Sequence, residues 1–164
     1  MSDDEFEAPV GASVWERQMF EFLTSHARRE SQMLDGYLSA AEASESKAFA
    51  YLVGLLMEDE RRHHRQFSDL AKSLKTEAEL SSAEPVVPRL DLHRGDREAI
   101  LRLTHELIAN EEDDAAELKR LRKELRDLED TTLWALLVET MQLDTAKHLA
   151  VLHFIEQHAK RRHL

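Results

Sequence analysis

A carboxylate and an imidazole lie one helical turn apart in the segment Met57–Phe67, which reads Met-Glu-Asp-Glu-Arg-Arg-His-His-Arg-Gln-Phe. Glu60 and His63 stand at positions i and i+3. Apolar residues before and after them recur every three or four positions, which is the spacing of a buried helix face. A buried carboxylate without a partner is costly, so we expect this pair to be hydrogen-bonded, ion-paired or bound to a metal.

The same interruption of an apolar helix face recurs in three other segments. The interrupting residues are His26 and Glu30 (residues 14–43), Glu60 and His63 (46–75), Glu111 and Asp114 (96–128), and Asp144 and His148 (132–158). Residues at the middle of each helix meet at similar depth in a four-helix bundle, so we predict one polar chamber. Buried acids without cations would repel one another, whereas carboxylates and imidazoles together suit iron or manganese.

Four long helices must position these residues. The chain has 164 residues, enough for about one domain, and its 34% charged residues with only 4 Gly and 3 Pro favour long amphipathic helices over a sheet. Ser13 and Glu16 have the spacing of a capping box, which predicts a helix start after an acidic, disordered tail over residues 1–12. The long link over residues 76–96 predicts a crossover. The prediction is an all-α, antiparallel four-helix bundle over residues 13–160.

Composition excludes several classes of function. The net charge of −11 leaves no basic surface for nucleic acid, and the absence of Cys excludes disulfides, iron–sulfur clusters and thiol catalysis. The N-terminus lacks a signal sequence, and no run of about 18 apolar residues suggests a membrane span. We therefore expect a soluble cytoplasmic protein, a homodimer or higher homo-oligomer, whose chemistry uses Asp, Glu, His or Tyr.

Two motifs resemble the ferritin-like di-iron carboxylate proteins, such as rubrerythrins and bacterioferritins. Glu30-Ser-Gln-Met-Leu-Asp-Gly-Tyr37 is similar to their first-helix segment, and Glu60-Arg-Arg-His63 is similar to their second-helix motif. The resemblance covers about residues 14–158. It implies two metal ions, iron or manganese, held by Glu30, Glu60, His63, Glu111, Asp144 and His148.

The second half departs from the family pattern and leaves alternatives open. The fourth helix reads Asp144-Thr-Ala-Lys147-His148, so Asp replaces Glu and Lys147 stands where the motif has His. An internal alignment pairs His148 with His64, so either His63 or His64 is a candidate ligand. The residues expected beside the site, or as alternative ligands, are His26, Tyr37, His64, Glu112, Asp114 and Lys147.

The resemblance implies an oxidation. Two metals about 3.5–4 Å apart can deliver two electrons, so we expect Fe(II), or another reductant, to be oxidised by oxygen or peroxide, as in a ferroxidase or another di-iron oxidase. The alternative is a bundle that binds one metal or none and has a structural or interaction role. A hemerythrin-like oxygen binder is a third, more distant reading of His26-x-x-x-Glu30.

Overall fold

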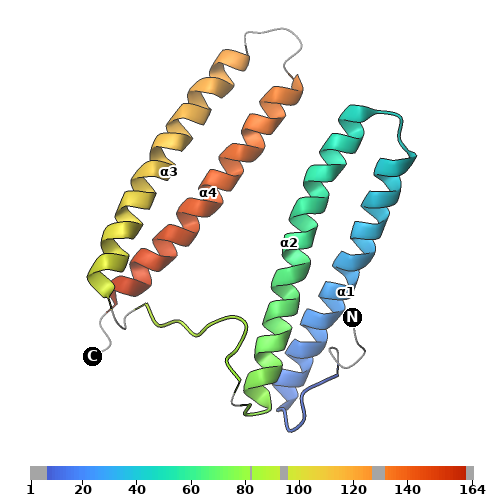
Figure 1. The fold of residues 1–164 in the computed structure, drawn as a ribbon, viewed down its shortest axis with the longest axis vertical. Helices are drawn as coiled ribbons and strands as arrows, with labels where there is room; N and C mark the ends of the chain where they lie inside the picture. The colour runs from blue at the N-terminus through green and yellow to red at the C-terminus, as the bar shows by residue number, and fades with distance from the viewer. Residues whose placement is uncertain (1–6, 82, 93–95, 127–131, 162–164) are drawn as a thin grey trace. The chain divides into compact units, whose positions relative to one another are not determined.

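The computed structural model describes residues 7–81, 83–92, 96–126 and 132–161. These residues form α-helices and no strands, in the order α1 (Val14–Ala43), α2 (Lys47–Ala78), α3 (Arg97–Leu125) and α4 (Thr132–Lys160) (Figure 1). The all-helical class predicted from composition is confirmed over this part of the chain.

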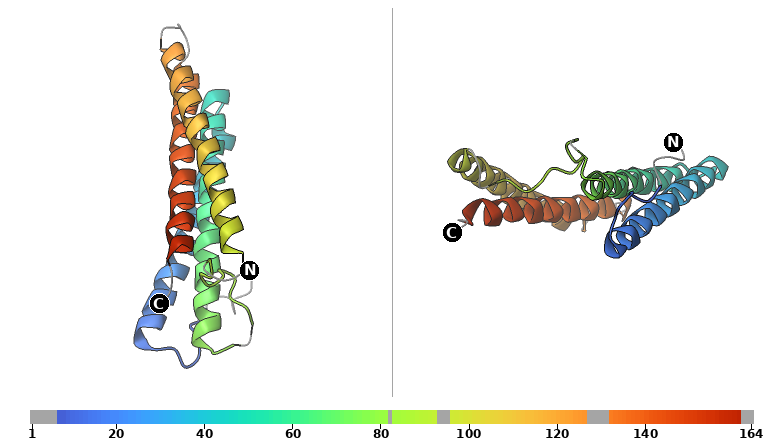
Figure 2. Two further views of the ribbon diagram at one scale, coloured as in Figure 1. Left: turned by 90° about the vertical axis from the view of Figure 1, so that its left-hand side faces the viewer. Right: turned by 90° about the horizontal axis from the view of Figure 1, so that it is seen from below.

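The chain divides into two compact units, Met1–Arg89 and Leu90–Leu164. In the first unit α1 packs along α2, and in the second α3 packs along α4, so each unit is a helical hairpin (Figures 1 and 2). Whether the four helices form the predicted single bundle therefore depends on how the two hairpins associate.

Local signals explain where the first hairpin begins and bends. The predicted capping box is present, because the backbone N–H of Glu16 donates to the Ser13 hydroxyl and that of Ser13 donates to the Glu16 carboxylate. Ser46 caps α2 by accepting from the backbone N–H of Phe49. Residues 44–46 alone join the two helices, so the helices must lie side by side.

The core of the first hairpin lies toward the open end of α1. Phe20, Leu23 and Ala71 are buried there, and Met19, Phe67 and Leu74 pack against them. Phe20 is only 1% exposed. Burying an aromatic side chain contributes about 1.5–3 kcal/mol, so this cluster is a main source of the hairpin's stability.

The apolar residues that recur beside Glu60 and His63 on α2 are only partly buried. Val53, Met57 and Ala71 form the seam against α1, whereas Leu56 and Leu70 remain 48% and 44% exposed. A helix that packs against a single partner buries a narrower stripe than one inside a four-helix bundle. The exposed flank of α2 is thus an apolar surface that α1 does not cover.

Residues 9–12 depart from the prediction of a disordered tail over residues 1–12. Residues 1–6 of that tail lie outside the part of the chain that the structure describes. Gly11 takes a φ of +82°, the backbone N–H of Ala12 donates to the Pro9 carbonyl, and Ala12 is buried. The turn lies against the end of α2, where the backbone N–H of Val10 is 3.4 Å from Glu79 Oε1. The positive φ favours glycine, which explains how the chain turns here.

The link after α2 folds back along that helix. The backbone N–H of Val87 donates to the Ser73 hydroxyl over 2.7 Å, and Arg89 Nε is 3.5 Å from Glu77 Oε1. Part of the segment predicted as a crossover therefore belongs to the first unit.

In the second hairpin, polar contacts tie the two helices together at both ends. Arg97 Nε donates to the carbonyl of Ala159 over 2.6 Å, where the guanidinium also complements the C-terminal end of the α4 dipole. Near the other end, Arg122 donates to Glu139 over 3.0 Å. The predicted α3 end at Leu128 falls among residues 127–131, which lie outside the described residues; α3 ends at Leu125.

No helix among the described residues is both long enough and apolar enough to cross a membrane.

Candidate metal centre

Three predicted ligands come together in the first hairpin. Glu30 of α1 and Glu60 and His63 of α2 each offer a ligand atom, and these atoms lie within 4.8 Å of one another. Neighbouring ligands in a site with bonds of about 2.1 Å are separated by roughly 3–3.5 Å, so small side-chain rotations would close the group around an ion.

The two carboxylates face each other with unsatisfied acceptors. Glu30 is 6% exposed, and Oε2 of Glu30 and Oε2 of Glu60 are both buried without a hydrogen-bond donor. The imidazole of His63 lies beside this pair, with its Nδ1 3.6 Å from Glu60 Oε2. Buried acceptor oxygens of this kind require a proton or a cation, so the residues present fit a divalent metal ion.

The pKa of Glu60 reflects the same repulsion between the two acids. Direct contact with the Glu30 carboxyl is the main factor raising the pKa of Glu60, followed by burial and by the negative charge of Glu30. His63 acts in the opposite direction and lowers the pKa. A proton shared between the two acids occupies the place that a cation would take.

His26 holds Glu30 in position. Its Nε2 is 3.1 Å from Glu30 Oε1, and its ring lies 4.0 Å, between centroids, from the ring of Phe67. The imidazole thus orients one oxygen of Glu30 and leaves the other oxygen facing Glu60.

The neighbouring histidines His63 and His64 have different partners. His64 Nδ1 is 2.9 Å from the carbonyl oxygen of Ala27, so this nitrogen carries the proton and donates it to α1. His63 joins Glu30 and Glu60 instead. Tyr37, seven residues beyond Glu30, is about 10 Å further along α1 and lies outside the group.

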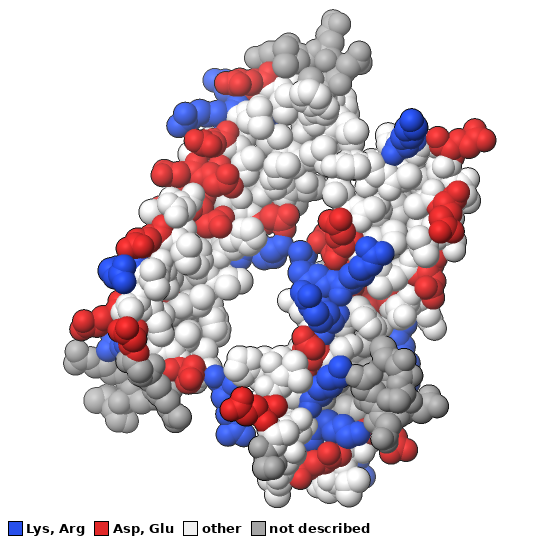
Figure 3. Space-filling view, viewed as in Figure 1, with Lys and Arg blue, Asp and Glu red and all other residues white. Residues whose placement is uncertain are grey.

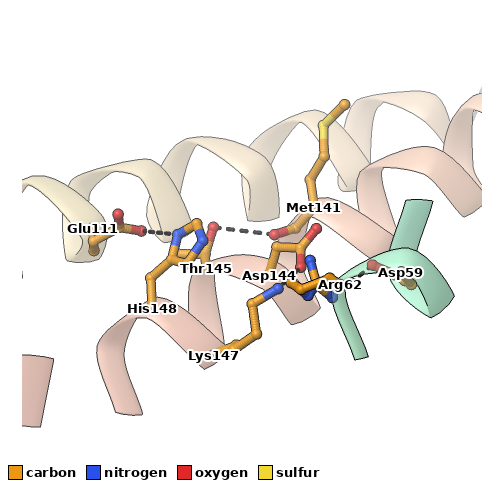
Figure 4. Close-up of polar contacts among 8 residues, drawn as sticks. All are labelled: Asp59, Arg62, Glu111, Met141, Asp144, Thr145, Lys147 and His148. Atoms are coloured by element: carbon orange, nitrogen blue, oxygen red, sulfur yellow. Dashed lines mark hydrogen bonds and ion pairs between the residues drawn. The ribbon is translucent and has the colours of Figure 1, made fainter. Parts of the chain in front are cut away.

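The second hairpin pairs its predicted ligands differently. Glu111 Oε2 is 3.3 Å from His148 Nδ1 (Figure 4). Asp114 Oδ2 accepts from the Thr145 hydroxyl over 3.0 Å. Both contacts join α3 to α4 beside an open cavity of about 440 Å³, whose lining also includes Asn110, Met141 and Asp144. Thr145 was not predicted from sequence, because a threonine hydroxyl on a helix usually bonds its own backbone, as Thr145 also does with Met141.

Lys147 pairs with Asp144. The ammonium group forms an ion pair with the Asp144 carboxylate, which is 55% exposed (Figure 4). Within the described residues, only Glu30, Glu60 and His63 bring three ligand atoms within 4.8 Å. Glu111, Asp144 and His148 therefore lie near one another without forming a comparable group.

Comparison with known proteins does not assign this chain to a family. No family model matches the chain, and no curated protein or solved structure matches it significantly.

Proposed function

We propose that this chain is a ferritin-like metal-binding protein whose first hairpin binds a divalent iron or manganese ion through Glu30, Glu60 and His63. The observation that carries this proposal is the pair of buried carboxylate oxygens that face each other without a donor. A divalent cation satisfies both acceptors at once and removes the repulsion between the two acids.

The donor set supports hard or borderline metals. Two carboxylates and one imidazole suit iron(II), manganese(II) or zinc(II) better than copper(I), which prefers thiolates and thioethers. Three protein ligands leave coordination positions open, as in sites that carry out chemistry rather than purely structural sites. His26 would keep Glu30 in a binding orientation and limit its freedom to rotate away.

A di-metal centre requires the second hairpin. We propose that the exposed apolar flanks of the two hairpins, which include Leu56 and Leu70 on α2 and Leu107 and Val151 on the second hairpin, pack together into an antiparallel four-helix bundle. Glu111 and His148, with Asp144 or Asp114, would then bind a second ion. The Glu111 to His148 contact supports this proposal, because it brings two of the predicted ligands together across α3 and α4.

The proposed reaction is the oxidation of Fe(II) by oxygen or peroxide. Two Fe(II) ions give up two electrons and become Fe(III), while oxygen takes up these electrons and two protons to form hydrogen peroxide; hydrogen peroxide would take up two electrons and two protons to form water. Bound iron supplies these electrons, and the chain supplies carboxylates that favour the more highly charged ferric product.

Anaerobic titration of the purified protein with Fe(II) or Mn(II), followed by calorimetry, tests the metal site. We expect Glu60→Gln and His63→Ala to weaken binding by more than tenfold, because each removes one of three ligands. Glu58→Gln is the matched control, since Glu58 is an exposed acid on the same helix, and it should bind as the unmodified protein does. Equal binding by all variants would contradict the assignment.

A single-ion or metal-free bundle with an interaction role is the second candidate. The ion pair between Lys147 and Asp144 favours it, because an ammonium group already neutralises the carboxylate that a second ion would need. Stoichiometry separates the two candidates: two ions per chain support the di-metal centre, and one ion supports the single site. Loss of Fe(II), followed with a ferrous chelator after oxygen is admitted, then tests the oxidation itself.

A further inference from the structure

Two histidines face one carboxylate in the second hairpin. His105 lies on α3, whereas His153 and Glu156 lie on α4. Nε2 of His105 is 2.8 Å from Oε1 of Glu156, and Nδ1 of His153 is 3.8 Å from Oε2 of Glu156. Each oxygen of the carboxylate therefore faces a different imidazole, and the contact with His105 joins the two helices.

The register of the hairpin creates this group. His153 and Glu156 are three residues apart, so they are neighbours on the surface of α4. The register that sets Glu111 beside His148 also brings His105, about two turns nearer the start of α3, level with Glu156. His105 is far from the other two residues in the sequence, so no local spacing indicates that the three meet.

This group is separate from the residues proposed to bind a second ion. At 100° per residue, His153 lies about 140° around α4 from His148 and about 160° from Val151, which belongs to the flank proposed to pack on the first hairpin. The side chains of His105 and His153 are 54% and 56% exposed. The group therefore stays accessible to a metal ion when the two hairpins associate in that way.

The donor set of the group is one that metals use repeatedly. Two imidazoles and one carboxylate hold zinc in several metalloenzymes and leave coordination positions open for water. Imidazole nitrogen suits zinc well, and affinity for a given set of nitrogen and oxygen ligands is generally higher for zinc than for manganese or ferrous iron. The second hairpin thus offers zinc a better donor set than the first, which has a single imidazole and two carboxylates.

We propose that His105, His153 and Glu156 bind a zinc ion that clamps α3 to α4. Their ligand atoms do not all lie within 4.8 Å of one another, so one side chain must turn toward the others. The ligands of a zinc ion are roughly 3–3.5 Å apart, which the contact between His105 and Glu156 nearly meets already. His153 is the residue that must move, and its exposed ring can turn without breaking the contact between the helices.

The charges around the group act in both directions. The ammonium group of Lys160 is 2.6 Å from Glu156 Oε1 and competes with a metal ion for that oxygen. Exposed ion pairs contribute little to stability, so a divalent ion can displace the ammonium group. On the face drawn in Figure 3, acidic side chains gather over α3, the helix that supplies His105. Such a surface raises the local concentration of cations.

Calorimetric titration of the full-length Glu60→Gln variant with zinc chloride tests the proposal. This background removes one ligand of the candidate metal centre in the first hairpin, so the result does not depend on that centre. We expect His105→Ala and His153→Ala, each added to Glu60→Gln, to weaken zinc binding by more than tenfold, because each removes one of three ligands. His158→Ala is the matched control, since this histidine of α4 contacts the carbonyl of Phe154 instead, and it should bind zinc as the background does.

Thermal unfolding of the same variants is the second measurement. Zinc that binds the folded chain across two helices should raise the melting temperature of Glu60→Gln, and this rise should disappear in the His153→Ala variant. Helical circular dichroism without zinc confirms that the variants fold. Zinc affinity that is unchanged by both His105→Ala and His153→Ala, or that is lost in His148→Ala instead, would overturn the proposal, because the ion would then lie elsewhere.

Discussion

At the residue scale, the meeting of Glu30 with Glu60 dominates the candidate site. Two carboxylates that share a buried space cannot both be ionised without a counter-charge, and the raised pKa of Glu60 expresses this conflict. The imidazole of His63 offsets it only in part. The pair is consequently sensitive both to protons and to cations.

The pH dependence of stability follows from the direction of that shift. Because the pKa of Glu60 is higher in the folded than in the unfolded chain, its protonated form stabilises the fold at low pH, and this contribution is lost as pH rises through the raised pKa. We expect metal-free Glu60→Gln to gain about 1 kcal/mol over the unmodified protein near pH 7.5 and less near pH 4.5. Urea unfolding with a chelator present measures this. An equal difference at both pH values would contradict it.

Lys147 offers a second residue-scale test. Its ammonium group pairs with Asp144, where a second metal would need that carboxylate. If the ammonium excludes the ion, Lys147→Gln should raise the measured stoichiometry from one ion per chain to two, or strengthen weak second-site binding by about tenfold. Lys119→Gln on α3 is the control. Elemental analysis after dialysis gives the count, and an unchanged value would show that Lys147 does not control access.

At the element scale, two adjacent histidines on α2 have separate roles, one in the proposed metal binding and one in helix packing. His64 donates to the Ala27 carbonyl and so fixes how α2 lies against α1, whereas His63 faces the acids. In this way a buried carbonyl that already accepts a backbone hydrogen bond within its helix accepts a second hydrogen bond from a side chain. The contact keeps Glu30 and Glu60 at the same depth.

Alanine substitutions should separate these two roles. We expect His64→Ala to lower the free energy of unfolding by about 1–2 kcal/mol, because it removes an interhelical hydrogen bond and side-chain packing. His63→Ala should change metal-free stability by less than about 0.5 kcal/mol but weaken metal binding by more than tenfold. Urea unfolding and calorimetry on the same preparations measure both. The reverse pattern would mean that His64 is the ligand.

Packing within the first hairpin can be tested with two phenylalanines two positions apart. Phe20 is 1% exposed in the core, and Phe22 is 60% exposed. Phe20→Ala should cost about 3–5 kcal/mol, since it leaves a cavity, whereas Phe22→Ala should cost less than about 1 kcal/mol. Thermal and urea unfolding report both values. A large cost for Phe22→Ala would show that another surface covers it.

At the scale of the whole molecule, each unit is a hairpin with an apolar flank that its own two helices leave exposed. Apolar residues gathered along an exposed helix side mark interaction surfaces. Packing one hairpin on the other would bury them and bring the acidic residues of both units to one interior space.

Small-angle scattering tests this association. A compact chain of this length has a radius of gyration of about 15 Å, and separated hairpins would give a larger value. For the monomeric protein, we expect Fe(II) or Mn(II) to lower the radius to near this value. Glu60→Gln should respond less to the metal. A radius that stays large with the metal bound would contradict a bundle within one chain.

The sequence by itself determined the helices and the polar positions within them. Periodicity and the Ser13 to Glu16 capping box are local signals, because turns and caps depend on neighbours within a few residues. The place of Glu60 and His63 on one helix face follows from the same arithmetic. These properties can therefore be read from the chain before any packing is known.

Only the tertiary structure decided which polar residues meet. Sequence could not choose between His63 and His64, since neighbouring residues point about 100° apart and only the position of α1 selects one of them. It also could not foresee that Thr145 would donate to Asp114 across two helices. Such contacts depend on the register and rotation of one helix against another, which packing over the whole hairpin sets and no local pattern encodes.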